Sequence, residues 1–246
     1  MDYDFYNREE RALCSHLFRL LHEWITPSSD TALIARFLNQ SGVTVEQENL
    51  REIKIFTEVA LIRDAYFHRK PDVEKFIDLL AGEIITQEEL GDVRVYSELP
   101  DVLKNPSETH PGQIRRKAKD IGIELTRDEN SLYGAMQGMF NAKPDLAITF
   151  SNSLIVYEAK YTQSFDDAQL KRTQNIGEVW RNLLYRDLGF ESPPSTTVST
   201  IGPAVFKPDI SWEWIFGLVQ LTYPSDDRTY VAMRSAVEYL SNDFKV

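Results

Sequence analysis

The sequence predicts an α/β protein in which helices flank a mixed sheet and an α-helical extension precedes it. Two short apolar runs, residues 146–150 and 154–157, are separated by Ser-Asn-Ser at residues 151–153, which predicts two strands joined by a tight turn. Two later apolar runs, residues 196–201 and 214–223, predict strands that complete the sheet. Segments before and after this hairpin carry apolar residues at helical spacing, which predicts the flanking helices.

The first hundred residues are predicted to be helical. Apolar spacing and capping residues predict helices over residues 8–25, 31–38 (capped by Asp30), about 46–68, and 72–81 (ended by Gly82). Pro100, Pro106 and Pro111 then predict a boundary between an acidic helical region, residues 1–105, and a second domain, residues 106–246. Further helices are expected over residues 113–121, 132–140, 168–188 and 228–240.

Composition excludes several classes of site. Cys14 is the only cysteine, which excludes an intramolecular disulfide and a cysteine-based zinc cluster and suits a reducing compartment. The four histidines show no metal-ligand spacing. The N-terminus does not resemble a signal sequence, and no apolar run approaches the ~20 residues that a membrane-spanning helix needs. We therefore expect a cytoplasmic protein that does not associate with a membrane.

The net charge of −11 is unusual for a protein that binds nucleic acid, since such proteins usually carry a basic surface. Residues 1–101 hold 11 Lys and Arg against 20 Asp and Glu, so most of the acidic excess lies there. This region is not expected to touch phosphates. Its apolar residues, including Leu13, Leu17, Leu20 and Trp24, either cover the sheet, pair with a second copy or dock on a protein partner, and we expect docking on a partner.

A basic cluster lies in the helix expected over residues 113–121. It consists of Arg115, Arg116, Lys117 and Lys119. Such a cluster is either a solvated helix face or a set of phosphate contacts, and the sequence leaves both interpretations open.

The end of the predicted hairpin carries three charged side chains. Alternation along a strand places Glu158 and Lys160 on the same face, and pairing about the turn brings Asp145 beside them. Buried charges are costly unless they are paired or bind a metal. Two carboxylates and a lysine suit a hard divalent cation and an anionic substrate. The alternative is an exposed ion pair, which would contribute about 0–1 kcal/mol.

Pro144-Asp145, followed thirteen positions later by Glu158-Ala159-Lys160, resembles the motif of the PD-(D/E)XK nuclease superfamily, which has the restriction-endonuclease-like fold. The resemblance covers about residues 108–223. It implies that Asp145, Glu158 and the Ala159 carbonyl bind Mg²⁺, with Mn²⁺ as a possible substitute. It also implies that Lys160 orients or helps to deprotonate the attacking water and offsets charge on phosphorus.

The resemblance implies further site residues. Members of this superfamily often carry a glutamate on the helix before the first motif strand, and Glu129 fits that place, with Glu124 as the substitute. The alternative for Glu129 is a helix cap. The helix after the lysine often carries a polar residue that reaches the site, which matches Gln169. Lys171 and Arg172 follow it and are expected to contact nucleic-acid phosphates, with surface solvation as the alternative.

Taken with this resemblance, the sequence predicts a Mg²⁺-dependent endonuclease that hydrolyses phosphodiester bonds in DNA. No separate sequence-reading module is recognisable, so we expect the effector subunit of a bacterial defence complex, with protein partner subunits or a second copy. Three alternatives remain: a catalytically weak assembly subunit with the nuclease fold, a nuclease that cuts RNA, and a helical scaffold with a chance motif.

Overall fold

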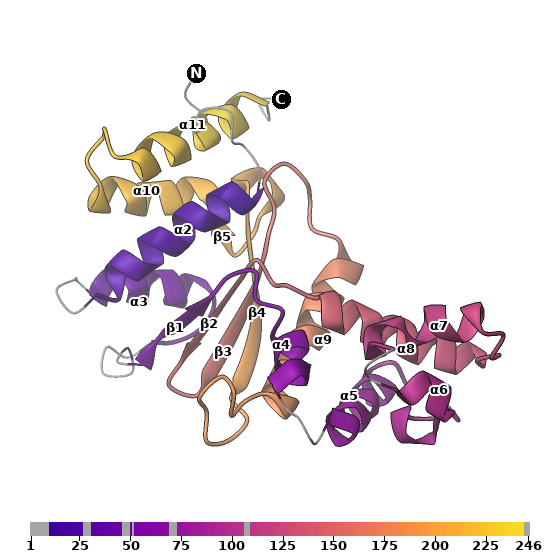
Figure 1. Cartoon of the computed structure of the whole chain (residues 1–246). Helices are drawn as coiled ribbons and strands as arrows, with labels where there is room; N and C mark the ends of the chain where they lie inside the picture. Colours follow the sequence, from indigo (N-terminus) through magenta and orange to yellow (C-terminus); the bar gives the residue numbers. More distant parts are fainter. Residues whose placement is uncertain are drawn as a thin grey trace. The chain divides into compact units, whose positions relative to one another are not determined.

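The computed structural model describes residues 10–26, 31–45, 50, 52–68, 73–105 and 109–243 (Figure 1). The chain forms two compact units. A sheet unit comprises residues 1–59, 144–177 and 194–246, and a helical unit comprises residues 60–143 and 178–193. The predicted domain boundary after residue 105 therefore falls inside the helical unit, and the N-terminal region is divided between the two units.

The sheet unit contains a five-stranded mixed sheet with the order β1-β2-β3-β4-β5. The strands are β1 (Lys54–Phe56), β2 (Leu146–Phe150), β3 (Ser153–Ala159), β4 (Ser195–Gly202) and β5 (Ile210–Ser211). The first three strands are antiparallel, whereas β4 runs parallel to β3 and β5 runs parallel to β4. The mixed α/β class, the β2–β3 hairpin and the strand at 196–201 are thereby confirmed.

Four helices cover one face of the sheet (Figure 1). They are α2 (Glu10–Trp24), α3 (Thr31–Gln40), α10 (Trp212–Thr222) and α11 (Arg228–Asp243). Their apolar side chains form one core with those of Ile148 and Tyr157 in the hairpin. The hydroxyl groups of Ser41 and Tyr157 lie 2.8 Å apart in this core. The predicted helices at 31–38 and 228–240 are confirmed, and the helix predicted at 8–25 is confirmed from Glu10 to Trp24. Residues 8 and 9 and the cap predicted at Asp30 lie outside the described residues.

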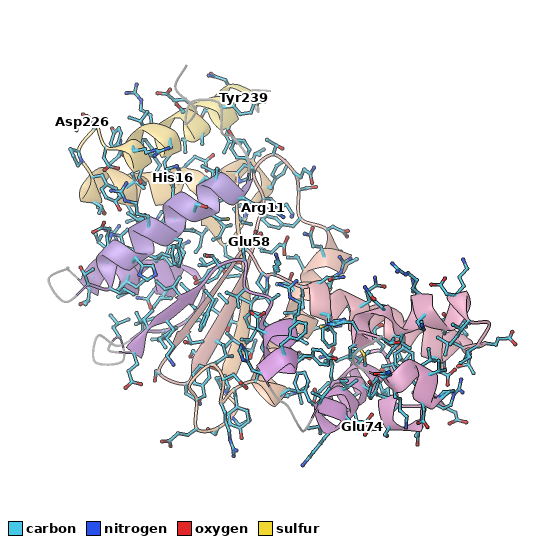
Figure 2. The ribbon with its side chains drawn as sticks, in the orientation of Figure 1. Arg11, His16, Glu58, Glu74, Asp226 and Tyr239 are labelled. Carbon is cyan, nitrogen blue, oxygen red and sulfur yellow. The ribbon has the colours of Figure 1, made fainter. Side chains whose placement is uncertain are left out.

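The N-terminal helices belong to the core of the sheet unit. Leu13, Leu17, Leu20 and Trp24 are all buried in the apolar cluster that includes the β2 and β3 side chains. Covering the sheet, and not docking on a partner, is therefore the role that the structure assigns to this apolar stripe. Polar contacts also fix α2: His16 Nδ1 lies 3.3 Å from Thr229 Oγ1 on α11, and Arg11 Nε lies 3.5 Å from Glu58 Oε1 after β1 (Figure 2).

Two segments form a different kind of element from the one predicted. Residues 52–68 do not form one helix, because they contain β1 and, after a break, α4 (Leu61–His68); residues 46–49 and 51 lie outside the description. Residues 214–223 do not form a strand, because all but Tyr223 belong to α10. The Ser211 side chain accepts a 3.1 Å hydrogen bond from Trp214 N and caps this helix. A short apolar run fits a buried helix as well as a buried strand.

The helical unit contains α4, α5 (Val73–Gln87), α6 (Asp101–Lys104), α7 (Ile114–Asp120) and α8 (Arg127–Asn141). The helices predicted over residues 113–121 and 132–140 are confirmed as α7 and α8. The helix predicted to end at Gly82 continues through it to Gln87. Residues 71 and 72, where that helix was predicted to begin, lie outside the described part of the chain.

Candidate active site

The site lies where β2 begins and β3 ends. The paired residues Leu146 and Tyr157 are the last of the ladder, so the same register places Asp145 opposite Glu158. Residues directly opposite each other in an antiparallel pair lie on the same face of the sheet. Asp145 Oδ2 accepts a 2.9 Å hydrogen bond from the backbone N–H of Ala159, which fixes this carboxylate beside the end of β3. The predicted convergence of Asp145 and Glu158 is present in the structure.

Glu158 and Lys160 form a buried ion pair. Lys160 Nζ donates a 2.8 Å hydrogen bond to Glu158 Oε1, and each residue is 8% exposed. Taking two charges out of water costs several kcal/mol per ion, which attraction and further hydrogen bonds must offset. The exposed surface pair, considered from the sequence as the alternative, is not what the structure shows.

Helix α9 (Asp167–Leu183) supplies two more donors to Glu158. The Gln169 side-chain amide donates to Oε1, and Thr173 Oγ1 donates a 2.9 Å hydrogen bond to Oε2. Thr173 is 4% exposed. A carboxylate has roughly four acceptor positions, and Lys160, Gln169 and Thr173 use three of them. The Glu158 carboxylate is therefore held in one orientation.

The spacing of residues along α9 explains how this helix reaches the site. Gln169, Thr173 and Gly177 are each four positions apart, so they share one face of the helix. A Cβ atom at Gly177 would lie 2.9 Å from Thr196 Cγ2 and 3.3 Å from Val156 Cγ2. The missing side chain lets α9 approach β3 and β4 closely enough for Gln169 and Thr173 to contact Glu158.

The backbone of Lys160 is held on both sides. Its N–H donates a 2.8 Å hydrogen bond to the Ile201 carbonyl, and its carbonyl accepts a 2.7 Å hydrogen bond from Trp212 Nε1. Trp212 is fully buried. These contacts fix the chain after β3 and direct the Lys160 side chain back toward Glu158. Thr173 was not predicted from the sequence, although its position four residues after Gln169 was a usable signal.

The donor set fits a magnesium ion. Mg²⁺ is usually bound through one or two carboxylates and keeps several waters, so the carboxylates of Asp145 and Glu158 with the Ala159 carbonyl suffice. In the described ranges, no group of three or more His, Cys, Asp or Glu side chains could hold a metal, so the ion would be bound by the two carboxylates, the carbonyl and waters. A cation at Glu158 would use its remaining acceptor position or displace one of the three donors.

Glu129, the further carboxylate that the sequence suggested, lies in the helical unit. Arg94 Nη2 donates a 2.8 Å hydrogen bond to Oε2, and Arg94 Nε donates to Oε1. Glu129 and Thr126 also form a capping box at the start of α8. The hydrogen bonds from Arg94 are the main reason that the pKa of Glu129 is lowered to about 2. These partners account for its burial within the helical unit. Its substitute, Glu124, is exposed in the same unit.

The predicted phosphate-contacting cations fall into two groups. Lys171 and Arg172 are exposed on α9, just after Gln169. The basic cluster of α7 belongs to the helical unit, where Arg115, Arg116 and Lys119 line a cavity and Lys117 does not.

No family model, curated protein or solved structure matches this chain. Among the helices that the structure describes, none is both long and apolar enough to cross a membrane.

Proposed function

We propose that the protein is a metal-dependent phosphodiesterase of the PD-(D/E)XK type, with a restriction-endonuclease-like sheet, and that it hydrolyses DNA. The observation that carries this proposal is the buried Glu158–Lys160 pair opposite Asp145, at the end of a strand pair. A buried charge cluster fixed by hydrogen bonds from a neighbouring helix is costly to form. Burial, charge partners and convergence are features of functional sites.

Each residue has a distinct role in the proposed reaction. Asp145 and Glu158, with the Ala159 carbonyl, would hold Mg²⁺. When bound, this ion would polarise a phosphoryl oxygen and lower the pKa of water. Lys160 Nζ orients the attacking water and offsets the negative charge that develops on phosphorus. The water gives up a proton to solvent as its oxygen bonds to phosphorus, the P–O3′ bond breaks, and the 3′ oxygen takes up a proton from solvent and leaves as a hydroxyl group.

Gln169 and Thr173 act as positioning residues because they hold the Glu158 carboxylate from both oxygens. Lys171 and Arg172 are exposed on α9, two and three residues after Gln169, so they are suited to contact the DNA backbone. Specificity and recruitment would then come from partner subunits of a bacterial defence complex.

One observation favours a second candidate, the catalytically weak assembly subunit. Lys160 and Glu158 neutralise each other, and three donors already occupy Glu158. If metal does not displace one of them, the cluster serves to hold β3 against α9 and turnover is slow.

Cleavage by the purified full-length chain tests the proposal. Duplex DNA, single-stranded DNA and RNA are each incubated with Mg²⁺ or with EDTA. We expect DNA cleavage that requires the metal, is lost in Lys160→Ala and is retained in the control Lys75→Ala, which alters an exposed lysine of α5. Preferential cleavage of RNA would change the substrate, and cleavage that persists in Lys160→Ala would contradict the assignment of this site.

A further inference from the structure

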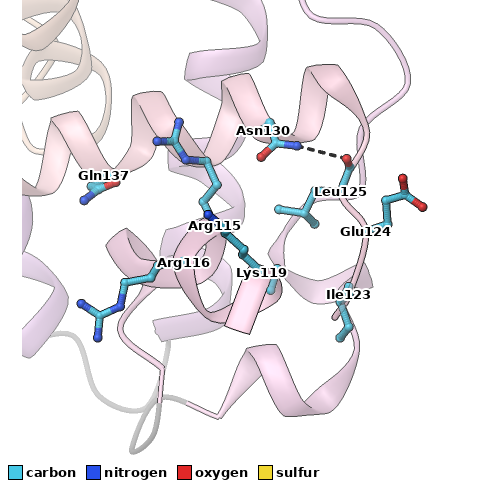
Figure 3. A pocket seen from close by; sticks show the side chains of 9 residues that line it. Arg115, Arg116, Lys119, Ile123, Glu124, Leu125, Asn130 and Gln137 are labelled. Atoms are coloured by element: carbon cyan, nitrogen blue, oxygen red, sulfur yellow. Dashed lines mark hydrogen bonds between the residues drawn. The ribbon is translucent and has the colours of Figure 1, made fainter. Parts of the chain in front are cut away.

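A cavity of about 570 Å³ lies within the helical unit, between α7 and α8 (Figure 3). Its lining includes Arg115, Arg116 and Lys119 from α7, Leu125 before α8, and Asn130 and Gln137 from α8. Small-molecule sites in proteins measure about 300–1,000 Å³, so this cavity has the size of a ligand site. The proposed nuclease reaction makes no use of it.

The cavity is electropositive. Three cations line it against one carboxylate, that of Glu124. Arg116 is also 3.9 Å from Asp120, in a pair whose two side chains are exposed. Within the described part of the chain, no carboxylate forms an ion pair with Arg115 or Lys119. In a protein with a net charge of −11, these two cations are therefore available to an anionic ligand.

The guanidinium group of Arg115 lies against helix α8 at Gly134, which has no side chain. A Cβ atom at Gly134 would lie 2.7 Å from Arg115 Nη1, too close for any real contact. The guanidinium group therefore rests against the backbone of α8, and Figure 3 shows it reaching toward that helix between Asn130 and Gln137. At Gly138, one turn later, an added Cβ atom would meet nothing within 4 Å.

The cavity lining can also accept a hydrogen bond and make apolar contact. The Asn130 side-chain amide donates to the carbonyls of Leu125 and Thr126, both at 3.0 Å, which fixes the carboxamide and leaves its oxygen as an acceptor. The Leu125 side chain supplies apolar surface next to it. A nucleotide combines phosphate oxygens for the cations with a base that has both amino donors and an apolar face.

We propose that this cavity is a nucleotide-binding site, in which Arg115 and Lys119 bind phosphate and Asn130 and Leu125 contact the base. The nucleotide is either free or one unit of a nucleic-acid strand, since both present the same chemistry. The proposal does not depend on the carboxylate site of the sheet unit, and its test needs no catalysis.

Binding is measured with the full-length chain in EDTA, so that no metal-dependent cleavage occurs. The probes are ATP, GTP, CTP and UTP, tripolyphosphate without a base, and a short fluorescent oligothymidylate. We expect Arg115→Gln and Lys119→Gln each to weaken binding about tenfold, as the loss of one charge-assisted hydrogen bond predicts. The control Lys75→Gln removes an exposed charge elsewhere in the same unit and should leave affinity unchanged. Binding of a nucleoside triphosphate identifies a free nucleotide, whereas binding of the oligothymidylate alone identifies a strand.

The position of the Arg115 guanidinium group against α8 is tested with two glycine variants that keep every charge. An added Cβ atom at Gly134 should make the Arg115 guanidinium group shift while keeping its charge, so Gly134→Ala should weaken binding by less than Arg115→Gln does, while Gly138→Ala should bind as the wild type does. Thermal melting verifies that neither variant loses its fold. Equal affinity in Arg115→Gln, Lys119→Gln and Lys75→Gln would overturn the site. Equal affinity for tripolyphosphate and nucleotides would overturn the contact of the base with Asn130 and Leu125. Wild-type affinity in Gly134→Ala would show that binding does not depend on the position of the Arg115 guanidinium group against α8.

Discussion

Lys160 Nζ donates a 2.8 Å hydrogen bond to Oε1 of Glu158, two residues earlier on the same face of the sheet, and both residues are buried. Removing one partner of such a pair leaves an uncompensated buried charge, which costs about 3–5 kcal/mol. The two residues should therefore be coupled strongly in folding, whether or not they are coupled in catalysis.

A double-mutant cycle in urea measures that coupling. We expect Lys160→Met to lower the free energy of unfolding by about 3–5 kcal/mol, and Glu158→Gln combined with it to restore part of the loss, because no unpaired charge then remains. The exposed pair of Arg234 and Glu238, 2.7 Å apart, provides the control, and Arg234→Met should leave stability nearly unchanged. Additive losses at positions 158 and 160 would contradict the coupling.

The proposed chemistry makes a separate prediction. Asp145→Ala, Glu158→Ala and Lys160→Ala should each abolish metal-dependent cleavage, and the three losses should be strongly non-additive because the residues serve one step. Rates are compared at saturating Mg²⁺ with duplex DNA, after circular dichroism has verified the fold. Wild-type turnover in Asp145→Ala would remove the metal-site assignment.

Variants of Thr173 test whether this residue acts by positioning the Glu158 carboxylate. Thr173→Val keeps the shape of the side chain but deletes the donor to Glu158 Oε2, so a buried carboxylate oxygen loses a partner. We expect a loss of about 1–3 kcal/mol in stability and slower cleavage at saturating substrate. The control is Thr86→Val, because the hydroxyl group of the exposed Thr86 bonds to the backbone of its own helix. Restoration of activity by Thr173→Ser, which keeps the hydroxyl group, would distinguish a lost hydrogen bond from altered packing.

The sequence predicted the centre of the site because its geometry is local. Alternation along β3 places Glu158 and Lys160 together, and a short hairpin brings Asp145 opposite them. Contacts that depend on distant segments could not be read in this way. The partner of Glu129, Arg94, lies thirty-five residues earlier, so an acidic residue at a helix start fitted a cap and a catalytic role equally well. Likewise, the apolar stripe of α2 predicts burial but not the surface that it packs against.

Acid should destabilise the helical unit through Glu129. The pKa of Glu129 falls from its ordinary value of 4.5 to about 2, chiefly because Arg94 donates hydrogen bonds to the carboxylate. A lowered pKa contributes stability that is complete above pH 4.5 and is lost as pH falls toward 2. We expect the free energy of unfolding of Glu129→Gln to depend less on pH between about 5 and 2 than that of the wild type. Glu124→Gln, at an exposed glutamate of the same unit, should keep the wild-type dependence, and equal profiles for all three proteins would contradict this role.

The N-terminal helices should be required for the sheet unit to fold. Leu20 is fully buried in the core shared with β2 and β3, and Phe37 of α3 lies with its ring centroid 5.7 Å from that of Tyr157. Leu20→Ala should lower the free energy of unfolding by about 2–5 kcal/mol, as for other large-to-small core changes. Leu221→Ala, at a leucine that is 65% exposed, provides the control and should have little effect.

A fragment of residues 106–246 extends this prediction. It keeps Asp145, Glu158 and Lys160 but lacks α2, α3 and β1, so one face of the hairpin and the edge of β2 would be exposed. An uncovered apolar sheet face with an unpaired strand edge favours aggregation. We therefore expect an insoluble fragment, measured as the share of protein in the soluble fraction beside the full-length chain. A soluble, cooperatively unfolding fragment would show that residues 106–246 fold without the N-terminal helices and that the burial of these helices against the sheet is dispensable.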